Sequence, residues 1–175
     1  MPGINELRRH VSAGKGVSNT LLWRLGKLAC GRDFHGVYPA NKIPRSLARR
    51  GRFVVIVNLG ERQPGVAKLP VGHFVCVAGE VGKVNYVDPY GLPCIQPKVV
   101  QFLSDCQRKV WENKKQIQHF DSAYCALYSL LFAVYFDKKF SNALPSKRFC
   151  LRFYRDRLKS NDRKCVEYLQ RLINA

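Results

Sequence analysis

The sequence predicts an α+β fold in which a central sheet packs against one buried central helix, with further helices at its flanks. Three short runs rich in Val, Ile and Phe, at residues 53–57, 72–78 and 83–87, have the length and composition of strands. Residues 123–136 are apolar nearly all round a helix, as expected for a helix that is buried on every side.

In the N-terminal part, residues 18–29 are expected to form a helix. Ser18 or Asn19 can cap its first turn, and Gly31 can end it. Its apolar face is expected to hold Leu21, Leu22, Leu25 and Leu28. Residues 32–45 contain a glycine and two prolines, and we expect them to be a loop.

The three expected strands come next. Residues 53–57 are apolar at every position, which is typical of a strand covered on both faces. Residues 72–78 and 83–87 are separated by a glycine-containing turn and can form an antiparallel hairpin. Because Pro89 cannot continue a central strand, Asp88 is expected at the end of the hairpin.

Three more segments complete the expected fold. Residues 97–111 have the apolar spacing of a helix, and residues 115–119 are expected to be a short extended piece. Asp121 or Ser122 is then expected to cap the central helix. The amphipathic segment at residues 161–173 predicts a last helix.

The composition indicates one folded domain with a strongly basic surface. The chain has 175 residues, with 30 Lys and Arg against 12 Asp and Glu, so its net charge is +18. A hydrophobic content of 46% argues against a disordered basic tail. No apolar run reaches the roughly 18 residues of a membrane span, and the start lacks the layout of a signal peptide. We therefore expect a single soluble domain over residues 1–175.

The positive charge is concentrated at the two ends of the sequence. Residues 1–52 hold 11 Lys and Arg against 2 Asp and Glu, while residues 146–175 hold 9 against 3. Cations that reach phosphates release counterions, so this charge predicts salt-sensitive binding to DNA. No DNA-reading motif is evident, so binding without sequence preference is expected. The alternative is that the charge only keeps the surface solvated.

Seven cysteines could serve as ligands, as disulfides or as a nucleophile. They are Cys30, Cys76, Cys94, Cys106, Cys125, Cys150 and Cys165. There is no C-x-x-C pair, and the four histidines lack zinc-site spacing, so no metal site is expected. Without a signal peptide, a disulfide framework is not expected either. Most of these thiols should be small buried side chains, and one can be a nucleophile.

Cys125 is the candidate nucleophile because it falls in the first turn of the expected central helix. The helix dipole and free N–H groups there favour a thiolate and can stabilise an oxyanion. His73 and Asp88, at adjacent ends of the expected hairpin, are the candidate base and the acid that orients it. Gln118 can add a second oxyanion donor. Taken alone, each of these residues also has a structural alternative: a core Cys, a structural His, a turn Asp.

These residues resemble the adenovirus protease (adenain) family of cysteine endopeptidases, whose catalytic residues follow the chain order His, acid, Gln, Cys. The similar segments are Gly72-His73-Phe74, residues 86–91 around Asp88, residues 118–125 with Ser122-Ala123-Tyr124-Cys125, Ile56-Val57-Asn58, and Gly36-Val37-Tyr38. The resemblance covers about residues 31–137. Two positions depart from it: Phe74 replaces the usual Trp, and Ala126 replaces the usual Gly.

The resemblance implies a cysteine protease fold with a mixed sheet and the cleavage of viral capsid and core precursors during virion maturation. It implies location in the virion and the host nucleus, no bound cofactor, and activation by DNA and by a viral peptide. Cys106 is near the position of the cysteine that links such a peptide through a disulfide. The two departures favour a divergent member from another animal DNA virus or a virus-like element.

Two other functions are compatible with the sequence. The SUMO- and ubiquitin-protease family has the same fold and residue order, so the chain can be an enzyme of the deubiquitinase type. The basic flanks and Ala126 also fit a non-enzymatic, DNA-binding virion protein.

Overall fold

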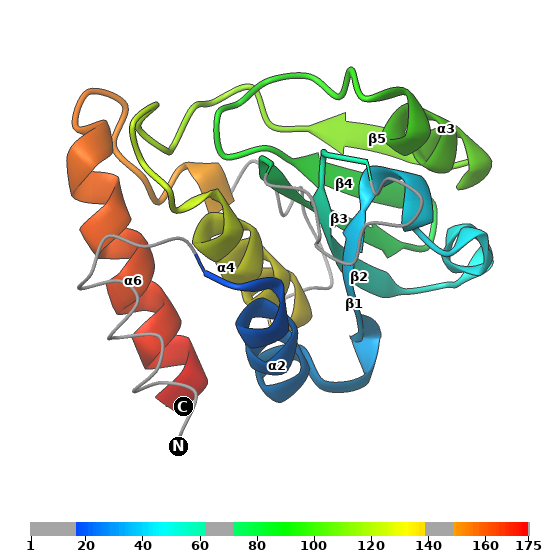
Figure 1. Ribbon diagram of the computed structural model, residues 1–175, viewed down its shortest axis with the longest axis horizontal. Helices are drawn as coiled ribbons and strands as arrows, with labels where there is room; N and C mark the ends of the chain where they lie inside the picture. The colour runs from blue at the N-terminus through cyan, green and yellow to red at the C-terminus, as the bar shows by residue number, and fades with distance from the viewer. Residues whose placement is uncertain (1–16, 62–71, 139–148, 175) are drawn as a thin grey trace.

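A five-stranded mixed sheet lies at the centre of the fold (Figure 1). The computed structural model describes residues 17–61, 72–138 and 149–174. In sheet order, the strands are β1 (Phe34–Pro39), β2 (Phe53–Asn58), β3 (Phe74–Glu80), β4 (Lys83–Val87) and β5 (Lys109–Glu112). The outer pairs β1–β2 and β4–β5 are parallel, and the two inner pairs are antiparallel. The predicted α+β class is confirmed.

Helices cover both faces of this sheet. They are α2 (Asn19–Cys30), α3 (Pro97–Asp105), α4 (Cys125–Lys138) and α6 (Leu158–Asn174), with short 3-10 turns η1 (Gly31–Asp33), η2 (Ala40–Lys42) and η3 (Arg45–Arg49). One face packs against α2 and α4, with α6 packed on these two helices, and the other face packs against α3, η2 and η3. In the described part of the chain, no helix has the length and apolar character needed to cross a membrane.

The all-apolar strand β2 explains the two-sided core. Each of its six residues is buried. Val54 and Ile56 belong to the core under α4, whereas Val55 and Val57 belong to the core under α3. Because neighbouring side chains on a strand point to opposite faces, such a strand is stable only if both faces are covered. The prediction for residues 53–57 is confirmed.

Helix α4 is the buried central helix. Every residue from Ala126 to Phe136 is buried, and α4 contacts α2, α6, β2 and β3. Its C-terminal carbonyls are held by Arg52, whose Nη2 donates to the oxygen of Phe136 at 2.9 Å. The same guanidinium pairs with Asp33 at 2.8 Å, so one cation joins η1 to the negative end of the helix dipole.

The start of α4 differs from the prediction. The helix begins at Cys125, two residues later than expected, and the carbonyl of Tyr124 accepts its first bonds. Neither Asp121 nor Ser122 is therefore the cap. Ser122 closes a turn before the helix instead, because its N–H donates to the oxygen of His119 at 3.0 Å.

Helix α2 confirms the prediction for residues 18–29 in all but one side chain. The hydroxyl of Ser18 accepts the N–H of Leu21, and Gly31 ends the helix with a φ of 57°. Leu28, expected on the apolar face, is 55% exposed. The buried stripe is centred on Leu22 and Gly26, and Leu28 lies at its margin.

Two expectations about secondary structure were wrong. The expected loop at residues 32–45 contains β1, an edge strand, where Gly and Pro are tolerated. The expected helix at residues 97–111 ends at Asp105, because Gln107 has a φ of 51° and the chain then enters β5. Apolar spacing did not separate the helix from the edge strand that follows it.

The hairpin and the last helix form within three residues of their expected bounds, whereas residues 115–119 do not form the expected extended piece. The hairpin β3–β4 lies where it was expected, with Gly82 at a φ of 76° in its turn. Helix α6 contains the predicted segment 161–173 and begins three residues earlier. Residues 115–119 are irregular and join no strand. The prediction of one domain over residues 1–175 includes segments outside the described residues and stays a prediction.

Candidate active site

The β3–β4 hairpin brings His73 and Asp88 together. His73 directly precedes β3, and Asp88 directly follows β4. The two strands pair Cys76 with Val87, so continuing the register places the ends of the hairpin side by side. The His73 Nε2 lies 2.7 Å from the Asp88 Oδ1. The predicted proximity of these two residues is confirmed.

Asp88 is held from several sides. It is 2% exposed, and its Oδ1 also accepts the N–H of Tyr90 at 2.7 Å. The Asn113 carboxamide accepts the Asp88 N–H at 2.8 Å and donates to the Asp88 carbonyl at 2.6 Å. The carboxylate has two partners and the backbone of Asp88 is fixed by Asn113, so this buried side chain is well placed to orient a histidine.

Cys125 lies on the other side of the His73 ring. The imidazole hydrogen bonds to the Asp88 carboxylate, and Cys125 is close enough to raise the pKa of the ring as well. Since Nε2 faces the carboxylate, Nδ1 is the nitrogen left for the sulfur. Burial lowers the pKa of His73, but the hydrogen bonds and negative charges of its two partners outweigh this and raise it to about 9. An imidazolium beside the sulfur is the partner that a thiolate requires.

Cys125 lies at the first turn of α4, where backbone N–H groups can interact with a negative charge. The first N–H groups of a helix have no acceptor within it, and here the Tyr124 carbonyl receives the N–H groups of Leu127 and Tyr128 at 2.9 and 3.0 Å. The N–H of Cys125 itself therefore points out of the helix start, where it can donate to an anion. The side chain of Ala126 is buried in the core, so its methyl group does not occupy this space.

Gln118 is buried in the loop that leads to α4. Its Nε2 donates to the Ser122 carbonyl at 2.6 Å, and its own N–H donates to the oxygen of Pro89 at 3.1 Å. A carboxamide nitrogen carries two protons, so one remains for a second acceptor. Gln118 lies in the segment before Cys125, and its role as an oxyanion donor stays a prediction.

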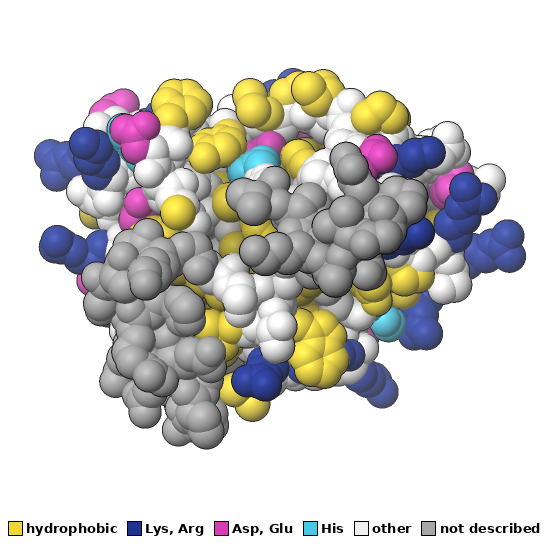
Figure 2. Space-filling view, in the orientation of Figure 1, with side chains coloured by type: hydrophobic (Ala, Val, Ile, Leu, Met, Phe, Trp, Pro, Cys, Tyr) yellow, Lys and Arg dark blue, Asp and Glu magenta, His cyan; other side chains and the backbone are white. Residues whose placement is uncertain are grey.

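An aromatic wall borders the histidine. Tyr90 stacks on the His73 ring with centroids 4.5 Å apart and an interplanar angle of 17°, and it also stacks on Phe120. Phe120 is 69% exposed. Figure 2 shows hydrophobic side chains gathered around a histidine at the upper rim of one face, with Lys and Arg at its two sides. Such a wall suits an extended chain lying across the site.

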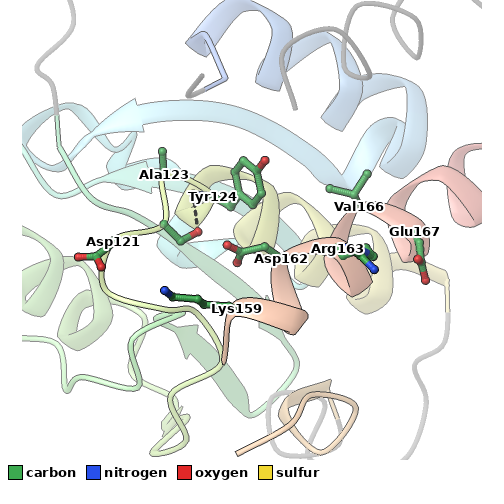
Figure 3. Close-up of a pocket in the computed structure, with 9 residues that line it drawn as sticks. Asp121, Ala123, Tyr124, Lys159, Asp162, Arg163, Val166 and Glu167 are labelled. Atoms are coloured by element: carbon green, nitrogen blue, oxygen red, sulfur yellow. Dashed lines mark hydrogen bonds between the residues drawn. The ribbon is translucent and has the colours of Figure 1, made fainter. Parts of the chain in front are cut away.

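A cavity of about 510 Å³ adjoins the residues that precede Cys125 (Figure 3). It lies between the start of α6 and the loop, and it is lined by Asp121, Ser122, Ala123, Tyr124, Lys159, Asp162, Arg163, Val166 and Glu167. Burial raises the pKa of Asp162, although hydrogen bonds from Ser122 and Tyr128 oppose the rise. The cavity therefore lies beside the loop that leads to Cys125, and its lining does not include Cys125 or His73.

Cys106 is not part of this constellation. It caps the C-terminus of α3 in the core on the far side of the sheet from α4, where it is 5% exposed. Burial raises its thiol pKa, which disfavours thiol exchange. Cys94, which lines a separate cavity of about 650 Å³ between α3 and β5, is more accessible.

The sequence did not single out two residues that the structure places here. Tyr90 lies opposite His73 if the hairpin register is continued, so a paired-strand argument could have identified it. Asn113 lies beside Asp88 because β5 pairs in parallel with β4, and the sequence did not suggest this pairing. Within residues 17–61, 72–138 and 149–174, no group of three His, Cys, Asp or Glu side chains could hold a metal ion.

Comparisons with known proteins assign no family to the chain. No protein-family model matches it, and a search of curated proteins finds no significant match.

The His73 imidazole is expected to titrate near pH 9 in an NMR titration of the ring protons. Replacing Asp88 by Asn removes the negative charge, so burial should then lower the midpoint well below this value. His35, whose pKa burial lowers below 6.5, provides an internal control in the same spectra. A His73 midpoint at or below 6.5 in the unaltered protein would contradict the arrangement.

The same shift has a consequence for stability. Because the folded pKa of His73 lies above its ordinary 6.5, the charged pair stabilises the fold fully below about pH 6.5 and ceases to do so as pH rises through 9. The difference in unfolding free energy between the protein and a His73→Gln variant should shrink by up to about 3 kcal/mol over this range. Urea unfolding at several pH values measures it, and a difference that grows with pH would disprove it.

Cys125 is expected to react with iodoacetamide at pH 7 before the other cysteines. Burial raises the pKa of Cys94 to about 11 and that of Cys150 to about 12, and it also raises those of Cys76, Cys106 and Cys165. Peptide mapping by mass spectrometry gives the rate at each site, with the partly exposed Cys94 as the matched comparison. The His73→Ala substitution should slow the reaction of Cys125 with iodoacetamide at least about tenfold. Equal rates at Cys94 and Cys125 would count against an activated thiol.

Proposed function

We propose that this protein is a cysteine endopeptidase of the adenovirus protease type. The observation that carries the proposal is that His73 hydrogen bonds to Asp88 at 2.7 Å, while Cys125, the first residue of α4, is close enough to raise the pKa of His73. A nucleophile, a base and an orienting acid in contact form the arrangement that acyl transfer requires. The sheet packed against a central helix that begins at the nucleophile is compatible with the cysteine protease fold.

The proposed reaction proceeds through a thioester. The Cys125 sulfur bonds to the scissile carbonyl carbon, whose oxygen becomes an oxyanion between the Cys125 N–H and the Gln118 amide. The C–N bond breaks as the leaving amine takes a proton from His73. Water then gives a proton to His73 and attacks the thioester, the C–S bond breaks, and the acid product leaves with Cys125 restored.

The substrate class follows from the resemblance of the sequence. The order His73, Asp88, Gln118, Cys125 is that of the adenovirus protease family, so the proposed substrates are viral capsid and core precursors in the virion and the host nucleus. A deubiquitinase-type enzyme would use the same four residues. Activation by a peptide bound through Cys106 receives little support from the burial of that thiol.

Peptide cleavage tests this proposal. The protein should cleave a member of a panel of peptides that carry Gly beside the scissile bond. Cys125→Ala and His73→Ala should each lose about 10³-fold or more in kcat. Gln118→Ala should lose about 10²-fold, the usual cost of one oxyanion donor.

Cys94→Ala is the matched control and should retain activity within about twofold. Ubiquitin and SUMO fusions belong in the same assay, because cleavage of these fusions alone would assign the protein to the deubiquitinase type. Full cleavage by the Cys125→Ala variant would rule out the assigned nucleophile.

We also propose that the enzyme acts while bound to DNA. The net charge of +18 supports this, as does its concentration in residues 1–52 and 146–175, outside the segments that carry His73, Asp88, Gln118 and Cys125. Figure 2 shows Lys and Arg around the edge of the face, with most of them at its two sides. A cationic periphery can hold phosphates without blocking the site.

Binding of the inactive Cys125→Ala variant to short DNA duplexes measures this association. Affinity should fall with salt, with a log–log slope of about 0.9 for each phosphate contacted, and unrelated sequences should bind alike. An absence of binding at 50 mM salt, or a strong preference for one sequence, would contradict the proposal.

A further inference from the structure

Two neighbouring residues of α6 reach opposite ends of the loop that carries Gln118. The first is Asn161, which is fully buried. Its Nδ2 donates to the Ile117 carbonyl at 2.8 Å and to the Tyr154 carbonyl at 3.0 Å, and its Oδ1 accepts the Tyr154 N–H at 2.9 Å. With both amide protons and the oxygen engaged, the Asn161 side chain has one orientation, and it fixes the residue directly before Gln118.

The second is Asp162, which reaches the other end of the loop. The Tyr128 hydroxyl donates to its Oδ1 at 2.8 Å, so the carboxylate is anchored to α4. Asp162 also lines the cavity together with Ser122, whose side chain acts against the rise that burial causes in the pKa of Asp162. Figure 3 shows the Asp162 side chain directed toward the loop between Asp121 and Tyr124.

Ser122 links this contact to Gln118. Ser122 lines the same cavity as Asp162, and its carbonyl accepts a proton of the Gln118 Nε2 at 2.6 Å. The Gln118 Oε1 has no hydrogen-bond partner among the described residues, so the Ser122 carbonyl is what orients the carboxamide. Movement of Ser122 would therefore turn the second amide proton away from its present direction.

The cavity of about 510 Å³ between α6 and this loop makes these hydrogen bonds more important. Side chains do not fill the space, so packing contributes less to holding residues 121–124 than it does elsewhere in the core. The backbone of the loop is supported at Pro89, through the N–H groups of Ile117 and Gln118, and at α6.

We propose that α6 is part of the catalytic apparatus, with Asn161 and Asp162 as positioning residues that hold Gln118 ready to stabilise an oxyanion. Neither residue touches the candidate nucleophile, and both act through the loop at residues 117–122. The catalytic consequence rests on the proposed function, whereas the positioning itself does not. A small displacement of an oxyanion donor is enough to lower a rate strongly.

Kinetics test the catalytic consequence in the full chain. Asp162→Ala and Ser122→Ala should each lower kcat about tenfold and leave KM within about twofold, because the loss falls on the transition state. Glu167→Ala is the matched control: this exposed residue lines the same cavity on the same helix and should leave kcat within twofold. Combining Asp162→Ala with Gln118→Ala should be no slower than Gln118→Ala alone. If the double variant instead lost kcat by the product of the two single-variant losses, the proposal would be overturned.

NMR tests the positioning independently of activity. The side-chain amide signals of Gln118 should shift toward those of a free carboxamide in Asp162→Ala and in Ser122→Ala, and should not move in Glu167→Ala. Asp162→Asn, which keeps an acceptor oxygen, should give a smaller shift. Unchanged Gln118 signals in both alanine variants would refute the positioning role. If the Gln118 signals shift but the protein cleaves no peptide, the positioning role is supported and the proposed function is refuted.

Discussion

The burial of α4 is the constraint on which the rest of the structure depends. A helix with buried residues from Ala126 to Phe136 has no face to offer to water, so α2, α6 and the sheet must surround it. Arg52 closes its C-terminal end, and this leaves the N-terminal turn as the exposed end. Cys125 is placed at that turn, half-buried, because the helix begins where the apolar run reaches the loop.

The β3–β4 register then determines what Cys125 meets. Antiparallel pairing places the residue before β3 opposite the residues after β4, so His73 has Asp88 and Tyr90 as neighbours. Asn113, at the end of β5, fixes the backbone of Asp88. A charged pair in a partly buried position is stable only when its remaining hydrogen bonds are made, and these contacts make them.

The surroundings separate Cys125 from the other cysteines. Burial holds Cys76, Cys106 and Cys165 in the neutral form, whereas Cys125 has a histidine and a helix N-terminus beside it. Most of the basic residues also lie in other parts of the sequence than the four candidate site residues. The basic residues are concentrated in the flanks of the sequence, and hydrophobic and aromatic side chains border the candidate site. The proposed binding to DNA and the proposed chemistry can therefore use different surfaces.

The sequence by itself determined the α+β class, the buried strand at residues 53–57, the hairpin, the central helix, and the grouping of His73 with Asp88. Each of these depends on local periodicity or on a short connection, which a linear pattern records. Only the tertiary structure decided that residues 34–39 and 109–112 are edge strands, because parallel pairing joins segments that are distant in the sequence. It also decided the roles of Asn113, Asn161 and Asp162, which are polar residues without a motif. Their partners lie across the sheet or on another helix, and hydrogen bonds between distant segments leave no periodic signal in a sequence.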